Sequence, residues 1–142
     1  MGRTAGRGAL RIEEVRGAPV TGNKVETMSR DQLVARFAEI GEAQSTAELM
    51  GRTEAFNKLF KRMTSIEDEL KQRDGDQRRA LVTLFAHPNM QVRLNAAKAV
   101  RPVEPEVARR QLEEIAASRH YPQAGDAGMS LWAWDEGIYR PE

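Results

Sequence analysis

Apolar residues recur at spacings of three and four from Ser29 onward, which is the period of one face of an α-helix. In the first such segment the apolar stripe runs through Leu33 and Phe37 to Gln44, and it follows a Ser29–Gln32 capping box. No alternation of apolar and polar residues is sustained, so the pattern predicts no β-strand. The pattern therefore predicts an all-α fold.

Glycine, proline and capping residues divide this pattern into about six short helices. Gly51 is expected to close the first helix and Thr53 to cap the second. The expected boundaries that follow are RDGD at 73–76, HPN at 87–89, RPVEP at 101–105 and a loop, HYPQAGDAG, at 120–128. A last short helix is expected within residues 129–142, closed by Gly137.

Residues 1–28 show no helical period and are rich in glycine and basic residues, which predicts a flexible arm. Two interpretations of this arm compete. It is either a functional basic arm or a translated extension upstream of a start at Met28. The helical domain is assigned to residues 29–140.

The segment HPNMQVRLNAAKAV, at 87–100, resembles the second half of a HEAT-type repeat. This resemblance implies a short right-handed stack of helical hairpins, that is, a fragment of a HEAT-like α-solenoid. It also implies a structural role for Arg93. The guanidinium would lie along a turn between helices and bond to an acidic cap, either Asp76 or Asp74.

A second resemblance covers about residues 29–140. The order of segments from MSRDQLVARFAEI to a PQAGDAGM box and an LWA patch is similar to a small bacterial domain family of unknown function. Small HEAT-like domains of this kind are suspected to be immunity or adaptor proteins beside secreted toxins. The resemblance therefore implies a protein partner, for which a bacterial toxin is one candidate.

Both tryptophans and both tyrosines lie in the C-terminal segment 121–139. Trp132 and Trp134 are two positions apart, so on a helix they point in nearly opposite directions and cannot both enter one core. Three interpretations stay open: a cap on the end of the stack, an aromatic and acidic surface for a basic protein partner, and a small-molecule pocket. The candidate protein-binding residues are Asp126, Trp132, Trp134, Asp135 and Glu136.

A second candidate surface is basic. Arg73, Arg78 and Arg79 lie close together in the sequence and form a candidate phosphate-binding patch, which would suit a nucleic-acid-associated domain. The net charge is only +1 and no aromatic residue lies among these arginines to stack on bases. Nucleic acid is therefore the less favoured partner.

Composition and motifs narrow the function further. The chain has no cysteine, and neither His87 nor His120 has the spacing of a metal ligand, so no metal or cofactor is expected. No nucleotide-binding glycine motif or serine nucleophile elbow occurs, so we predict a non-enzymatic protein–protein interaction module without catalytic residues. No apolar run approaches the roughly 20 residues that cross a bilayer, so the expected location is cytoplasmic.

Overall fold

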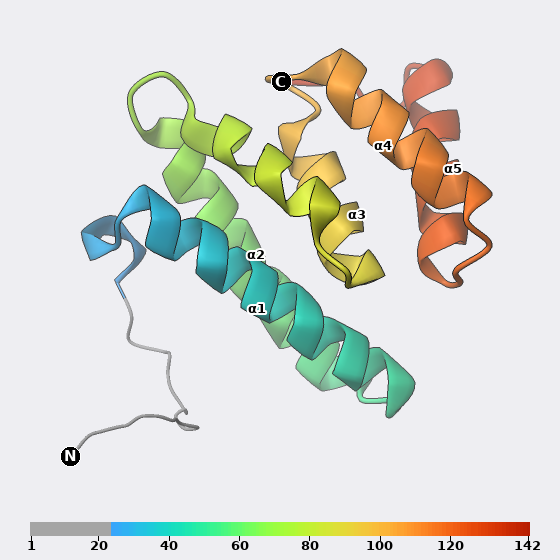
Figure 1. Cartoon of the computed structure of the whole chain (residues 1–142), viewed down its shortest axis with the longest axis horizontal. Helices are drawn as coiled ribbons and strands as arrows, with labels where there is room; N and C mark the ends of the chain where they lie inside the picture. Colours follow the sequence, from blue (N-terminus) through green and yellow to red (C-terminus); the bar gives the residue numbers. More distant parts are fainter. Residues whose placement is uncertain (1–23) are drawn as a thin grey trace.

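The computed structural model describes residues 24–142, and every regular element within them is helical (Figure 1). In chain order the elements are the 3-10 helix η3 (Val25–Thr27), α1 (Arg30–Leu49), α2 (Thr53–Gln72), the 3-10 helix η4 (Gln77–Ala86), α3 (Met90–Val100), α4 (Pro105–Ala117) and α5 (Gln123–Asp135). The predicted all-α class is confirmed, and six helices follow the short η3 in this part of the chain. The predicted arm lies mostly in residues 1–23, outside the described residues.

The helices pack as consecutive pairs: α1 with α2, η4 with α3, and α4 with α5. α3 also packs against α1 and α4, so it lies between the first pair and the last (Figure 1). Within residues 24–142 no helix is long and apolar enough to cross a membrane.

Local sequence explains where most of these helices begin. At α1, the backbone nitrogen of Gln32 donates to Ser29 Oγ at 3.1 Å and that of Ser29 donates to Gln32 Oε1 at 2.8 Å, which completes the predicted capping box. At α3, Asn89 Oδ1 accepts from the backbone nitrogen of Val92 at 3.1 Å, as predicted from HPN. Pro105 stands in the first turn of α4, where its missing N–H costs no hydrogen bond.

Two predicted helix starts were wrong. Arg52, not Thr53, is the N-cap of α2, and its side chain makes no capping hydrogen bond. The predicted loop at 120–128 is largely helix, because α5 begins at Gln123. Gly125 and Gly128 lie inside this helix, where their low helix propensity had suggested a loop. Gly137 closes α5 in a left-handed conformation with φ of 75°.

Two hydrophobic clusters form the core. The larger joins the first four long elements to the start of α4 and consists of Leu33, Phe37, Ile40, Met63, Ile66, Leu70, Leu81, Leu84, Val92, Ala96, Ala99, Val100 and Ala108. The smaller cluster joins α3, α4 and α5 and consists of Leu94, Ala97, Leu112, Ile115 and Ala127. One face of α3 packs in the larger cluster and another face packs in the smaller one. This explains why the helix is almost wholly buried.

A glycine lets α1 approach α3 closely. A Cβ atom on Gly41 would lie 2.7 Å from Cγ2 and 3.0 Å from Cα of Val92, so no side chain fits without displacing α3. The short distance brings polar side chains of the two helices within hydrogen-bonding reach.

Four buried amide side chains form a chain of hydrogen bonds across the molecule, which we call the amide ladder: Gln44, Asn95, Gln91 and Gln123. Asn95 Nδ2 donates to Gln44 Oε1 at 2.7 Å, and Gln91 Nε2 donates to Asn95 Oδ1 at 2.9 Å. Gln123 Nε2 in turn donates to Gln91 Oε1 at 2.9 Å. The amide ladder therefore connects α1, α3 and α5, and its buried groups favour this one arrangement of the three helices.

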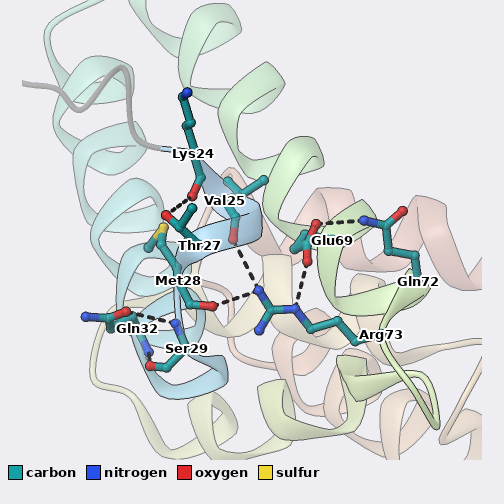
Figure 2. Close-up of polar contacts among 9 residues, drawn as sticks. All are labelled: Lys24, Val25, Thr27, Met28, Ser29, Gln32, Glu69, Gln72 and Arg73. Carbon is teal, nitrogen blue, oxygen red and sulfur yellow. Dashed lines mark hydrogen bonds and ion pairs between the residues drawn. The ribbon is translucent and has the colours of Figure 1, made fainter.

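Residues 24–28 belong to the folded structure, although the sequence had assigned them to the arm. Val25 and Met28 pack against the larger cluster. Figure 2 shows that Arg73, at the end of α2, reaches this segment: Nη2 donates to the carbonyl oxygen of Met28 at 2.7 Å and to that of Val25 at 3.2 Å. The Nε atom of Arg73 donates to the buried carboxylate of Glu69 at 2.7 Å.

Glu69 lies in an acidic run at 67–69, but it does not face the solvent. Its side chain is buried and its carboxylate pairs with Arg73, so this ion pair lies on the inner side of α2. Glu67 is half-buried near Arg78 and Arg101. Burial raises the pKa of the Glu67 carboxyl above its ordinary value, and the nearby positive charges offset only part of this rise.

We therefore expect Glu67→Gln to stabilise the protein at neutral pH. A raised pKa in the folded state means that ionised Glu67 opposes folding, and this penalty develops as the pH rises from the ordinary value of 4.5 through the raised one. Urea unfolding should show a more stable variant at pH 7 and a smaller difference at pH 4. Asp68→Asn, at the exposed neighbouring position, is the control. A loss of stability at pH 7 in Glu67→Gln would contradict the assignment.

The predicted partner of Arg93 was wrong. Its Nη2 atom lies 3.8 Å from Glu114 Oε1, so the arginine connects α3 to α4. Asp76 is instead held by Arg78, two residues further along the chain. Arg93 therefore contacts an acidic residue of the following helix, α4, and not an acidic residue of the turn before η4.

Candidate protein-interaction surface

The last helix carries the aromatic and acidic residues that the sequence singled out. The chain enters α5 through a cis peptide bond between Tyr121 and Pro122, and α5 packs against α4. The buried side of α5 presents Ala124 and Ala127 to the rest of the molecule. Its opposite side has no helix covering it among the described elements (Figure 1).

The two tryptophans point to different sides of α5, as their spacing predicted. Trp134 packs against the smaller hydrophobic cluster and meets Tyr139 edge to face, with ring centroids 6.1 Å apart. The Arg109 guanidinium lies 5.5 Å from the centroid of the Trp134 ring. Trp132 remains 52% exposed. Trp134 therefore packs within the domain, and about half of the Trp132 side chain is exposed to solvent.

The aspartates of the candidate site are already paired within the chain. Asp126 Oδ1 lies 3.0 Å from Lys98 Nζ, and Asp135 Oδ1 lies 2.9 Å from Arg109 Nη2. Both ion pairs are partly exposed, so each contributes little to the free energy of folding. Their geometry still ties α5 to α3 and α4. Glu136, at the C-cap of α5, is exposed and makes no ion pair with the described residues.

An apolar face remains on the outside of α5, and we call it the α5 face: Tyr121, Gly125, Gly128, Met129 and Trp132. The three large side chains are 68%, 64% and 52% exposed in chain order. Within the helix, Gly125 lies three residues before Gly128 and four before Met129, and these lie four and three residues before Trp132, so all four lie on one side of α5. Exposed apolar residues that gather on one rigid element are typical of an interaction site.

The three arginines of the predicted phosphate-binding patch each bind other residues of the chain. Arg73 is bound to Glu69 and to the segment 24–28, as described above. Arg78 is buried and its Nε atom donates to Asp76 Oδ1 at 2.8 Å, which lowers the pKa of that carboxyl. Arg79 is exposed, but its Nε atom donates to Glu104 Oε2 at 3.0 Å. Each arginine therefore serves a different internal contact.

The sequence interpretation missed Tyr121, Met129 and the two glycines of the α5 face. Residues 120–128 were predicted to form a loop, and in a loop the spacing of these residues to Trp132 does not indicate a shared face. The three-residue spacing from Met129 to Trp132 was the one signal that could have placed them together. Across residues 24–142, no three side chains of metal-binding type gather where one ion could be held.

Comparisons with known proteins give a family and a similar solved structure, and neither carries an activity. The model of a family described as a domain of unknown function (DUF2019) matches residues 31–135. The crystal structure of the protein RPA1889 from Rhodopseudomonas palustris CGA009 is similar, with a TM-score of 0.82 and 50% sequence identity. The match covers 84% of this chain and 98% of that one. No curated protein sequence matches the chain.

Proposed function

The chain belongs to the DUF2019 family of domains of unknown function, and from this premise we propose that it is a non-enzymatic protein-recognition module that binds its partner through the α5 face. The observation that carries the proposal is the exposure of Trp132 and Met129 on a helix whose other side is anchored. Tryptophan and tyrosine supply most of the binding energy at protein interfaces, because they bury large areas at a low entropic cost.

The rigidity of α5 supports a recognition role. The amide ladder, the Lys98–Asp126 pair and the Arg109–Asp135 pair all hold this helix in place. A partner would therefore meet a preformed surface and would not have to order it. Glu136 is exposed at one end of the α5 face and makes no ion pair with the residues that the structure describes. This charge favours a partner with a basic residue opposite it.

The paired helices support a finer proposal, that the fold is a right-handed, HEAT-like solenoid fragment with α5 as its last exposed helix. Solenoid domains of this size serve as adaptors, and an immunity protein that neutralises a bacterial toxin is the biological role we propose. In that role the chain acts in the cytoplasm. The alternative role, binding nucleic acid through Arg73, Arg78 and Arg79, has less support because these side chains are used internally.

Trp132→Ala is the variant that tests the proposal. We expect it to weaken partner binding by about thirtyfold, which corresponds to the 2 kcal/mol or so of a hot-spot side chain, and to leave unfolding nearly unchanged. The measurement is affinity capture from the native host with quantitative mass spectrometry, followed by calorimetric titration of the purified partner.

Phe60→Ala is the matched control, because Phe60 is an aromatic residue on α2 with a similar exposure of 51%. It should retain the partner fully. Equal recovery of the same partner by Trp132→Ala and Phe60→Ala would remove the α5 face as the binding surface. In the immunity role, growth protection against a toxin that the chain neutralises should follow the same order of variants.

A further inference from the structure

We propose that the α5 face also binds the α5 face of a second copy of this chain, with the two helices antiparallel about a two-fold axis. The inference rests on the proposed function, since it uses the same surface and names an identical chain as one occupant. Three features of α5 carry it: two glycines that lie beside large exposed side chains, the symmetry of their positions, and the charges at its two ends.

The α5 face has open notches between its large side chains. A Cβ atom on Gly128 would meet no atom within 4 Å, and one on Gly125 would meet only the Tyr121 ring, at 3.8 Å. Neither glycine is therefore required by packing within the chain. In a helix, glycine costs about 1 kcal/mol relative to alanine. Small residues on an exposed helix face allow a second helix to approach closely.

The positions of these residues are self-complementary. When the two-fold axis passes between Gly128 and Met129, Trp132 of each copy faces Gly125 of the other. The same axis places Met129 of each copy opposite Gly128 of the other. Met129 and Trp132 thus each meet a notch, and a two-fold interface forms each of these contacts twice.

The charges at the two ends of α5 favour the antiparallel orientation. Exposed Arg119 and His120 precede the helix, and exposed Glu136 follows it. In the antiparallel pair, Glu136 of one copy lies at the end that carries Arg119 and His120 in the other. A parallel pair would instead bring the two Glu136 carboxylates together, which is unfavourable.

The pair is expected to be weak. A single helix face buries less than the roughly 800 Å² per partner of a standard interface, so a reversible dimer with a dissociation constant in the micromolar range is expected. A second copy at this strength would be displaced by a tighter partner at the same face, so self-pairing and partner binding would compete.

Sedimentation equilibrium of the full chain, with Gly125→Leu as the variant, tests the inference. Leucine fills the notch that receives Trp132 of the second copy, so the dissociation constant should rise at least about tenfold, the factor that corresponds to 1.4 kcal/mol. Leucine also favours helix more than glycine does, so the thermal midpoint of the variant should not fall. A weaker dimer with an equal or higher midpoint separates loss of pairing from loss of folding.

A charge exchange tests the orientation independently. Glu136→Arg should weaken the dimer several-fold because it places like charges beside Arg119 of the second copy, and adding Arg119→Glu should restore most of the affinity. Restoration supports the antiparallel pair. Failure of the double variant to recover overturns it.

A chain that stays monomeric up to several hundred micromolar, or a Gly125→Leu variant that dimerises as well as the parent, would overturn the inference. The proposed function would survive either result if partner capture still depended on Trp132. Conversely, a dimer that follows these predictions in a chain whose capture does not depend on Trp132 would support the inference and remove the proposed function.

Discussion

Replacing Arg73 with alanine is expected to lower the free energy of unfolding by about 4 kcal/mol, because it leaves a buried carboxylate without its partner. The Arg73 side chain donates to Glu69, to Val25 and to Met28, so the substitution also frees the segment 24–28 from α2 (Figure 2). Urea unfolding followed by circular dichroism at neutral pH measures the change.

The control is Arg79→Ala, a neighbouring arginine from the same predicted patch. Arg79 is exposed and its pair with Glu104 is partly exposed too, so the loss should stay below about 1 kcal/mol. Adding Glu69→Gln to Arg73→Ala removes the unpaired charge and should recover part of the stability. Equal small losses in both arginine variants would show that the Arg73 contacts do not hold the first residues of the fold.

Asn95→Leu is expected to lower the free energy of unfolding by about 3 kcal/mol. Leucine has a similar size, but it removes the middle of the amide ladder, so Gln44 Oε1 and Gln91 Nε2 lose their partners in a buried site. Each buried polar group left without a hydrogen bond costs about 1–3 kcal/mol. Thermal and urea unfolding measure the loss.

Gln111→Leu is the matched control for the amide ladder. Gln111 is as buried as Asn95, but its amide nitrogen has no hydrogen-bond partner among residues 24–142. Replacing an amide whose buried nitrogen is already unsatisfied should be neutral or stabilising. Asn95→Leu behaving like Gln111→Leu would mean that the amide ladder contributes no stability.

Sequence periodicity predicted the helices well because the helix signals in this chain are local. The Ser29 capping box and the Asn89 cap depend on residues within three positions, and both form as predicted. The α5 prediction failed at its start, because the low helix propensity of Gly125 and Gly128 was outweighed by packing of Ala124 and Ala127 on the core. Local propensity alone does not include such tertiary contacts.

Partners between distant segments could not be predicted from one sequence. Gln44 was placed correctly on the inward face of the first helix, but nothing in the sequence relates it to Asn95, whose Nδ2 atom donates to its Oε1 atom at 2.7 Å. Arg73, Arg78 and Arg79 lie within seven residues of one another and yet make three separate contacts. Their proximity along the chain suggested a shared ligand, but Arg73 ends α2 while Arg78 and Arg79 lie in η4 and bind different carboxylates.

The candidate site was predicted only in part, because some of its features depend on contacts between distant segments. Spacing alone showed that Trp132 and Trp134 point in different directions, because helical geometry requires it. Spacing did not show which tryptophan packs against the core, since that depends on contacts with Arg109 and Tyr139. Nor did it show that Asp126 and Asp135 are paired with lysine and arginine of the neighbouring helices.

Photo-crosslinking inside the native host tests most directly whether the α5 face recognises a protein. A photoreactive amino acid in place of Met129 leaves Trp132 intact, and the same replacement at Leu49, which is 87% exposed at the end of α1, is the control. Recognition at the α5 face predicts a discrete adduct with another protein from position 129 and none from position 49. No adduct from position 129, or the same adducts from both positions, would contradict it.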